Sequence, residues 1–91
     1  MNVRSIIKGK LVLAPMAGVT NLPFRIMCRK YGAGLVCTEM INANALARGN
    51  KATYRLTETS PEEKPVSYQL FGTKEEYFIE SVKAIEDRAD I

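Results

Sequence analysis

Histidine and tryptophan are absent from the 91 residues, and cysteine occurs only twice, as Cys28 and Cys37. Two cysteines without histidine cannot complete a four-ligand zinc site of the usual kinds, so we predict no metal site. A catalytic cysteine would also need an activating base, and there is no histidine to act as one. We therefore expect both cysteines to be small buried hydrophobic residues, reduced rather than joined in a disulfide.

Long apolar runs are lacking as well. No stretch approaches the roughly 20 apolar residues that a membrane-spanning helix needs. Lys8, Gly9 and Lys10 interrupt the apolar residues near the N-terminus, which argues against a signal peptide. The predicted location is therefore the cytoplasm, with no membrane partner. Hydrophobic residues make up 46% of the chain and charged residues 25%, as in an ordinary globular domain.

Acidic residues are almost missing from residues 1–55, where nine Lys and Arg side chains stand against a single acid, Glu39. Residues 56–91 reverse this balance, with four basic and nine acidic side chains. A basic segment of this kind suits an anionic partner such as nucleic acid or a phosphate group. It is equally compatible with Lys and Arg side chains that only solvate the outer faces of helices.

Strand and helix patterns alternate along the chain. Apolar runs typical of strands buried on both faces cover residues 11–16, 34–40 and 65–72, and helical patterns follow after Asn21, over 42–50 and after Thr73. Asn21 can cap the first helix, which would end at Gly32 and bury an apolar stripe from Phe24 to Tyr31. Thr73 to Glu76 has the pattern of a capping box. The polar segment 51–64 is expected to be a loop with at most one helical turn.

This β-α-β-α-β-α order predicts an α/β fold with parallel strands and right-handed crossovers. Three parallel strands alone would leave both sheet edges open, and a closed (β/α)8 TIM barrel needs about 250 residues. We therefore expect residues 1–91 to be an incomplete N-terminal segment of such a barrel, about three βα units long, with residues 89–91 beginning a fourth strand. A small three-layer domain completed by oligomerisation is the alternative.

In parallel α/β folds the active site gathers at the C-terminal ends of the strands. Here these ends are Pro15-Met16-Ala17-Gly18, Thr38-Glu39-Met40 and Gln69-Leu70-Phe71-Gly72. Small residues and Gly18 leave the backbone open to a planar ligand, and the two methionines offer polarizable surface to an aromatic ring. The Gln69 amide can both donate and accept hydrogen bonds. The methionines could instead be core residues, and Glu39 could orient a ligand or pair with a nearby arginine.

Three stretches carry a family resemblance: LAPMAGVTNLPFR (13–25), YGAGLVCTEM (31–40) and YQLFG (68–72). In this order and spacing they closely resemble the N-terminal part of the tRNA-dihydrouridine synthases. The resemblance implies an FMN-dependent barrel that reduces a uridine of tRNA to 5,6-dihydrouridine, with the nicotinamide dinucleotide NADPH or NADH reducing the flavin. It also implies that Pro15, Met16 and Ala17 contact FMN and that Gln69 hydrogen-bonds the flavin ring.

The catalytic cysteine of that family lies in an Asn-x-Gly-Cys-Pro stretch after the fourth strand, beyond residue 91. Neither Cys28 nor Cys37 is therefore expected to take its role, and the 91 residues alone are expected to be inactive and to bind FMN weakly. Two other interpretations stay open. One is another FMN (β/α)8 oxidoreductase that acts on a small molecule, similar to a dihydroorotate dehydrogenase. The other is a non-catalytic fragment without a cofactor.

Overall fold

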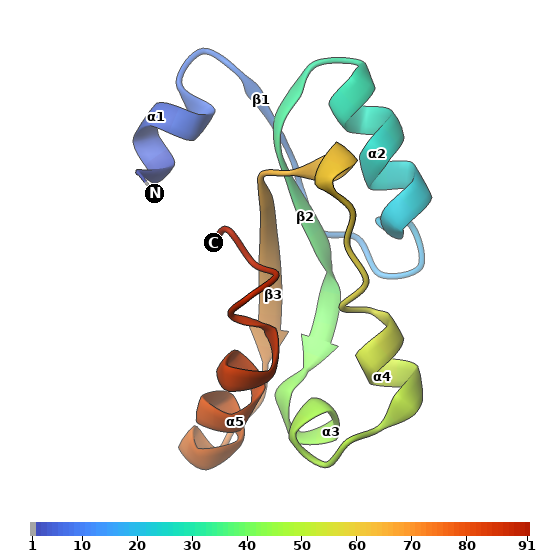
Figure 1. Cartoon of the computed structure of the whole chain (residues 1–91), viewed down its shortest axis with the longest axis vertical. Helices are drawn as coiled ribbons and strands as arrows, with labels where there is room; N and C mark the ends of the chain where they lie inside the picture. The colour runs from blue at the N-terminus through green and yellow to red at the C-terminus, as the bar shows by residue number, and fades with distance from the viewer. Residues whose placement is uncertain (1) are drawn as a thin grey trace.

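The computed structural model describes residues 2–91, and its strands and helices alternate for most of the chain (Figure 1). The elements are α1 (Val3–Ile7), β1 (Leu11–Leu13), α2 (Leu22–Lys30), β2 (Ala33–Asn42), α3 (Ala43–Ala47), α4 (Lys51–Arg55), the 3-10 turn η1 (Pro61–Glu63), β3 (Val66–Phe71) and α5 (Glu75–Ile85). The three strands form one parallel sheet in the order β1-β2-β3. The predicted α/β class is confirmed, and the sheet has the order of the first strands of a (β/α)8 barrel.

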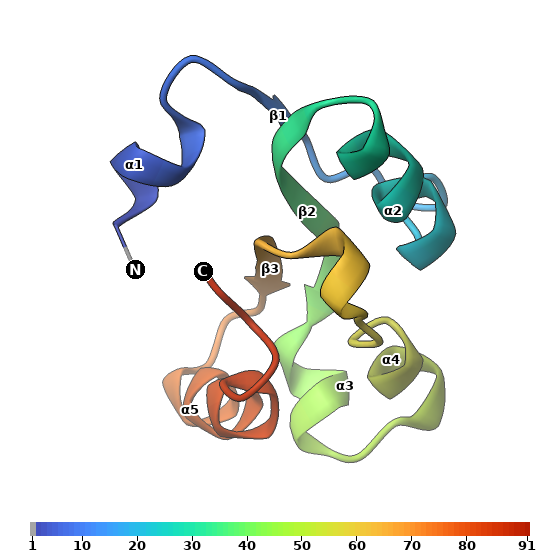
Figure 2. The same ribbon diagram turned by 45° about the horizontal axis from the view of Figure 1, so that its top comes forward.

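The hydrophobic core lies on one face of this sheet. It is formed by Val36, Ile41, Leu46, Val66, Tyr68 and Ile85, with Leu13 and Cys28 packed against it. Because these residues come from all three strands and from α2, α3 and α5, the helices that follow the strands cover the same face. Side chains alternate along a strand, so Gln69 points away from the face that Tyr68 joins, and it is exposed. Figure 2 shows α1 separate from the other helices, near the C-terminal residues.

Asparagine side chains begin four of the helices. The side-chain oxygens of Asn2, Asn21, Asn42 and Asn50 accept hydrogen bonds from the first-turn N–H groups of α1, α2, α3 and α4. The predicted cap at Asn21 is confirmed. The capping box predicted at Thr73 is wrong, because α5 begins after Lys74 and no side chain caps it. The cap at Asn50 begins α4, a five-residue helix in the segment that we predicted to be a loop with at most one helical turn.

The first strand differs most from its prediction. β1 ends at Leu13, three residues before the predicted end, and Pro15, which has no N–H to donate to a ladder, follows just beyond it. It is not buried on both faces, since Leu11 is 81% exposed. It is an edge strand, paired with β2 alone. The apolar stripe predicted to be buried on the first long helix, α2, is also partly exposed: Tyr31 is 87% and Met27 55% exposed.

The last two residues lie beside β3. The Ile91 N–H donates to the Val66 carbonyl at 3.3 Å, and the Tyr68 N–H donates to the Ile91 carbonyl at 2.9 Å. This alternation is the hydrogen-bond pattern of neighbouring parallel strands. The Asp90 carboxylate adds a bond from the Val66 N–H at 2.9 Å. Residues 90–91 thus occupy the position predicted for a fourth strand.

Candidate functional site

All three strands run in the same direction, and β2 and β3 end side by side, with Asn42 paired to Phe71 (Figure 1). β1 ends earlier, where Leu13 pairs with Val36, and the chain after it runs on to the level of Glu39. After β1 the chain forms a tight turn, in which the Met16 carbonyl accepts hydrogen bonds from the N–H groups of Val19 and Thr20 at 3.0 and 2.9 Å. Gly18 has a φ of +75°, a conformation that favours glycine. A Cβ atom at Gly18 would meet nothing within 4 Å. The main chain is therefore sterically open at Gly18.

Glu39 joins this turn to β2. Its Oε1 accepts a hydrogen bond from the Gly18 N–H at 2.6 Å. The ion pairs found among residues 2–91 do not include Glu39, so the predicted alternative of pairing with an arginine is wrong. The carboxylate instead holds main chain through a charge-assisted hydrogen bond, which is among the stronger kinds.

A β-bulge brings Met40 beside Gln69. Cys37 pairs with Ser67, but the next pair is Met40 with Gln69, so β2 carries one residue more than β3 in this interval. The Gln69 N–H donates to the Thr38 hydroxyl at 3.2 Å, in place of a regular ladder bond. Glu39 lies within this bulge. The same irregularity therefore positions both Glu39, which holds the turn, and Met40, which pairs with Gln69.

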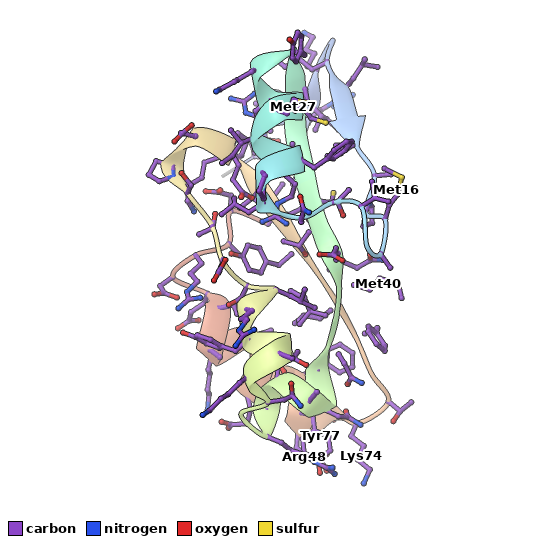
Figure 3. The ribbon with its side chains drawn as sticks, turned by 90° about the vertical axis from the view of Figure 1, so that its right-hand side faces the viewer. Met16, Met27, Met40, Arg48, Lys74 and Tyr77 are labelled. Atoms are coloured by element: carbon purple, nitrogen blue, oxygen red, sulfur yellow. The ribbon has the colours of Figure 1, made fainter. Side chains whose placement is uncertain are left out.

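The predicted site residues are accessible. Met16 is 41% and Met40 47% exposed, so neither is a core residue, and Figure 3 shows both on the same side of the ribbon. Ala17 and Gln69 are exposed and Pro15 is half-buried. The connection between the turn and Gln69 runs through Glu39 and its neighbour Met40. The structure thus places residues 15–17 and Gln69 on two segments that β2 links through Glu39 and Met40.

A buried ion pair between Arg25 and Glu63 is connected to the turn after β1 by hydrogen bonds. The Arg25 Nε donates to Glu63 Oε1 at 2.9 Å, and these side chains are 2% and 0% exposed. The same guanidinium donates to the carbonyls of Thr20 at 2.7 Å and Glu58 at 3.0 Å. The Thr20 hydroxyl in turn accepts from the Met16 N–H at 3.0 Å. A continuous set of hydrogen bonds therefore runs from Glu63 to the main chain of the candidate site.

Sequence reasoning missed this support. We considered the basic residues of α2 as solvated or as contacts for an anion, yet Arg25 is the buried residue of that helix. The helical period was a usable signal, because Arg25 precedes Cys28, which packs against the core, by three positions. Nothing local marks Glu63 as its partner, since 38 positions separate the two.

The cysteines lie outside this arrangement. Both are free and half-buried, so the absence of a disulfide was predicted correctly, whereas full burial was not. Burial raises the pKa of the Cys37 thiol, and a hydrogen bond with Ser67 opposes that effect only in part. A thiol of raised pKa is a poor nucleophile at neutral pH, and that Cys37 is not catalytic stays a prediction.

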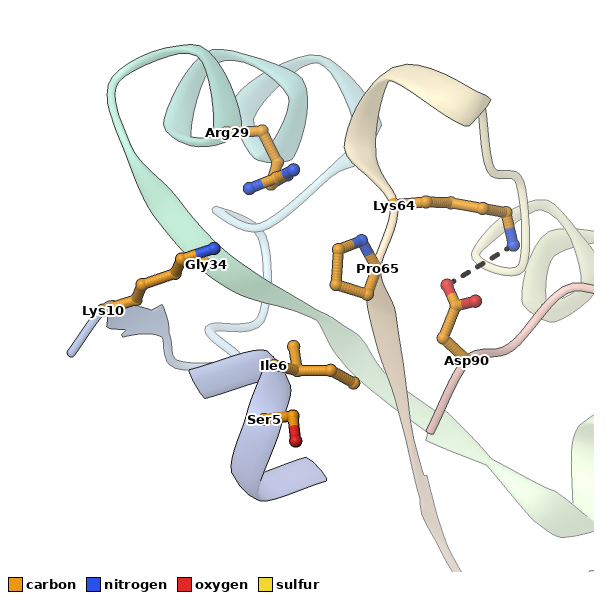
Figure 4. A pocket seen from close by; sticks show the side chains of 8 residues that line it. All are labelled: Ser5, Ile6, Lys10, Arg29, Gly34, Lys64, Pro65 and Asp90. Carbon is orange, nitrogen blue, oxygen red and sulfur yellow. Dashed lines mark ion pairs between the residues drawn. The ribbon is translucent and has the colours of Figure 1, made fainter. Parts of the chain in front are cut away.

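A cavity of about 450 Å³ lies at the opposite end of the sheet. Figure 4 shows its lining, which includes Lys10, Arg29, Gly34, Lys64 and Asp90, with the Lys64 Nζ 3.6 Å from Asp90 Oδ2. A cavity of this volume is not by itself evidence for the active site. Active sites of parallel α/β proteins form at the C-terminal ends of the strands, whereas these residues surround the beginnings of the strands.

The residues at the C-terminal ends fit one side of a flavin ring. They combine an open main chain at Gly18, two exposed thioethers, and the Gln69 amide, whose side chain has no hydrogen-bond partner within residues 2–91. No glycine-rich phosphate loop occurs in the sequence. Among the described residues, no group of His, Cys, Asp or Glu side chains could hold a metal ion. Between residues 2 and 91, no helix is both long and apolar enough to cross a bilayer.

Residues 12–91 match the model of the family described as dihydrouridine synthase (Dus). The tRNA-dihydrouridine synthase B of Xanthomonas campestris pv. campestris is 36% identical over 77 residues, which are 85% of this chain and 23% of that protein. The tRNA-dihydrouridine synthase B of Pseudomonas aeruginosa is 45% identical over 65 residues, 70% of this chain and 19% of that protein.

A fungal relative shows a similar likeness. The tRNA-dihydrouridine(47) synthase (NAD(P)(+)) of Coprinopsis cinerea is 40% identical over 78 residues, which are 86% of this chain and 12% of that protein. The chain therefore spans less than a quarter of the length of each of these three relatives.

Proposed function

Because the chain belongs to the dihydrouridine synthase family, we propose that it forms part of the flavin site of an enzyme that reduces uridine in tRNA to 5,6-dihydrouridine. In this proposal residues 1–91 are the N-terminal segment of an FMN-binding TIM barrel. The observation that carries it is the open turn at Met16 to Gly18, tied by Glu39 to the strand that places Met40 beside Gln69.

Pro15, Met16, Ala17 and Gln69 are the proposed FMN contacts. When bound, FMN would supply the hydride chemistry that protein side chains cannot carry out. The turn would give the ring a surface of main chain and thioether. The Gln69 amide, with two donors and one acceptor, would orient the polar edge of the ring. Residues 1–91 contain no phosphate-binding loop and no proposed catalytic residue, so we propose that they are inactive by themselves.

The proposed substrate is a uridine of tRNA, with NADPH or NADH as the reductant. The excess of basic side chains in residues 1–55 suits an RNA partner, and the name of the Coprinopsis relative includes NAD(P)(+). The target base has to leave its stack to reach a ring at the strand ends, as it does for other base-modifying enzymes. We place the reaction in the cytoplasm, where the two free cysteines would remain reduced.

The test uses the complete gene product. It is expected to show flavin absorbance after purification, and to form dihydrouridine in an unmodified tRNA transcript when NADPH or NADH is supplied. A protein that cannot take up FMN, or that holds FMN and leaves tRNA unchanged, would overturn the proposal. Reduction of a small molecule such as orotate in place of tRNA would favour the alternative oxidoreductase.

Replacing Gln69 tests the assignment of the site. Gln69→Ala is expected to weaken FMN binding by roughly 1–3 kcal/mol, the cost of leaving a buried polar group of the ring without its partner. Ser5→Ala, which removes an exposed hydroxyl from α1 at the other end of the sheet, is the control and should leave FMN affinity unchanged. Equal FMN affinity of Gln69→Ala and the unaltered protein would remove Gln69 from the site.

A further inference from the structure

Two cations share one tyrosine ring between α3 and α5. The Arg48 Cζ lies 5.4 Å and the Lys74 Nζ 5.7 Å from the centre of the Tyr77 ring. The Arg48 guanidinium also donates to the Tyr77 hydroxyl at 3.3 Å. Figure 3 shows the three side chains together, at the end of the molecule away from Met27. We call Arg48, Lys74 and Tyr77 the rim cluster.

The charge of the rim cluster is not neutralised by ion pairs. The salt bridges found in residues 2–91 involve neither Arg48 nor Lys74. Glu75 and Glu76 begin α5 nearby, and Glu76 opposes the effect of the cations on Tyr77. The cations prevail, because the hydrogen bond from Arg48, followed by its charge, lowers the pKa of the Tyr77 phenol. Arg48 and Lys74 therefore present two positive charges beside the ring that no ion pair found in residues 2–91 neutralises.

The position of the rim cluster relates it to the candidate flavin site. Arg48 directly follows α3, and α3 directly follows the C-terminal end of β2, whereas Lys74 follows the C-terminal end of β3. Gly72, between Gln69 and Lys74, packs against the start of α3. Five residues of extended chain span at most about 17 Å, so Lys74 lies within a few nucleotides' reach of Gln69.

The cluster is not needed to join the two helices. The Ser81 hydroxyl already donates to the Ala43 carbonyl at 2.8 Å in a buried position, and Leu46 and Ile85 belong to the same core. The Arg48 and Lys74 side chains are exposed, and exposed cation–π contacts add little to the stability of a fold. A role in binding explains their arrangement better than a role in folding.

We propose that the rim cluster binds the sugar-phosphate backbone of the substrate RNA next to the nucleotide that enters the flavin site. Arg48 and Lys74 would contact phosphate oxygens, and the exposed part of the Tyr77 ring would stack on a neighbouring unpaired base. This inference rests on the proposed function, since it names the part of the RNA that the same end of the sheet recognises.

The experiment compares two double variants of the complete gene product. R48A/K74A removes the two cations of the rim cluster. R4A/K8A removes one arginine of α1 and the lysine that directly follows this helix, at the opposite end of the sheet. Affinity for an unmodified tRNA transcript is measured at several salt concentrations. R48A/K74A is expected to bind several-fold more weakly, with the slope of log affinity against log salt reduced by about 1.4–1.8. R4A/K8A should keep the slope of the unaltered protein.

Flavin absorbance and thermal unfolding should be unchanged in both double variants. Y77F keeps the ring and should bind RNA nearly as well as the unaltered protein, whereas Y77A should bind it more weakly. If R48A/K74A does not fold, R48Q/K74Q tests the same expectation. An unaltered salt slope in a folded rim variant would overturn this inference alone. Failure of the unaltered protein to bind or modify tRNA would instead overturn the proposed function.

Discussion

Arg25 and Arg48 show two opposite uses of the same side chain. Arg25 is 2% exposed and its donors are matched by a carboxylate and two carbonyls. Arg48 is exposed, has no acidic partner within residues 2–91, and lies over an aromatic ring. The Arg25 guanidinium donates its hydrogen bonds to acceptors inside the fold and so fixes structure. The Arg48 guanidinium donates one hydrogen bond, to the Tyr77 hydroxyl, and keeps its other donors for a partner.

The two regions also differ in what surrounds them. The Arg25 region includes Thr20 and Glu63, both fully buried, and connects to the turn that we assign to the flavin. The Arg48 region lies on the surface at the same end of the sheet. The Arg25 region therefore supports the main chain of the candidate flavin site, and the Arg48 region adds exposed residues beside that site. Variants of the first should change stability and cofactor binding, and variants of the second should change neither.

The largest effect is expected from removing the buried carboxylate. Glu63→Ala leaves the Arg25 charge buried without its partner, and breaking a buried pair in this way costs about 3–5 kcal/mol. The free energy of unfolding of the complete gene product, measured with urea, should fall by that amount. Glu62→Ala removes the exposed neighbouring carboxylate and should change it by less than about 0.5 kcal/mol. Equal effects of both variants would erase the distinction between the two regions.

The same contrast shows which features the sequence could reveal. The parallel strands, the cap at Asn21 and the open turn at Gly18 follow from residues within one turn or one strand, and these predictions are confirmed. The Arg25–Glu63 and Arg48–Tyr77 contacts join residues 38 and 29 positions apart. Their partners depend on how helices pack, and no local pattern encodes that. Counting basic residues in 1–55 therefore could not separate a structural arginine from an available one.

A smaller effect is expected from changing Thr20, which connects the Arg25 guanidinium to the Met16 main chain. Thr20→Val keeps the shape of the side chain but removes the hydroxyl that accepts from the Met16 N–H. The unsatisfied N–H should destabilise the turn by roughly 1–3 kcal/mol, and the loosened turn should weaken FMN binding. Thr20→Ser keeps the hydroxyl and is expected to restore most of the affinity. If the valine variant binds FMN as tightly as the serine variant, the Arg25 region does not shape the flavin site.

The smallest effect is expected in the ionisation of two tyrosines, the buried Tyr68 and the more exposed Tyr77. Burial raises the pKa of Tyr68, whose hydroxyl donates to the Thr57 carbonyl at 2.7 Å, whereas the Arg48 hydrogen bond lowers the pKa of Tyr77. In an alkaline titration followed by tyrosinate absorbance, the component that Tyr77→Phe removes should ionise at a lower pH than the component that Tyr68→Phe removes.

These shifts also set the sign of the alkaline stability change. The folded Tyr68 resists ionisation, so its contribution to stability is complete below the unfolded pKa of about 10 and is lost as the pH rises beyond it. Tyr68→Phe should therefore flatten the alkaline decline in the free energy of unfolding, and Tyr77→Phe should not. An early component that persists in Tyr77→Phe would mean that the two cations do not act on this ring. The surface arginine would then differ from the buried one in exposure alone, without a prepared binding geometry.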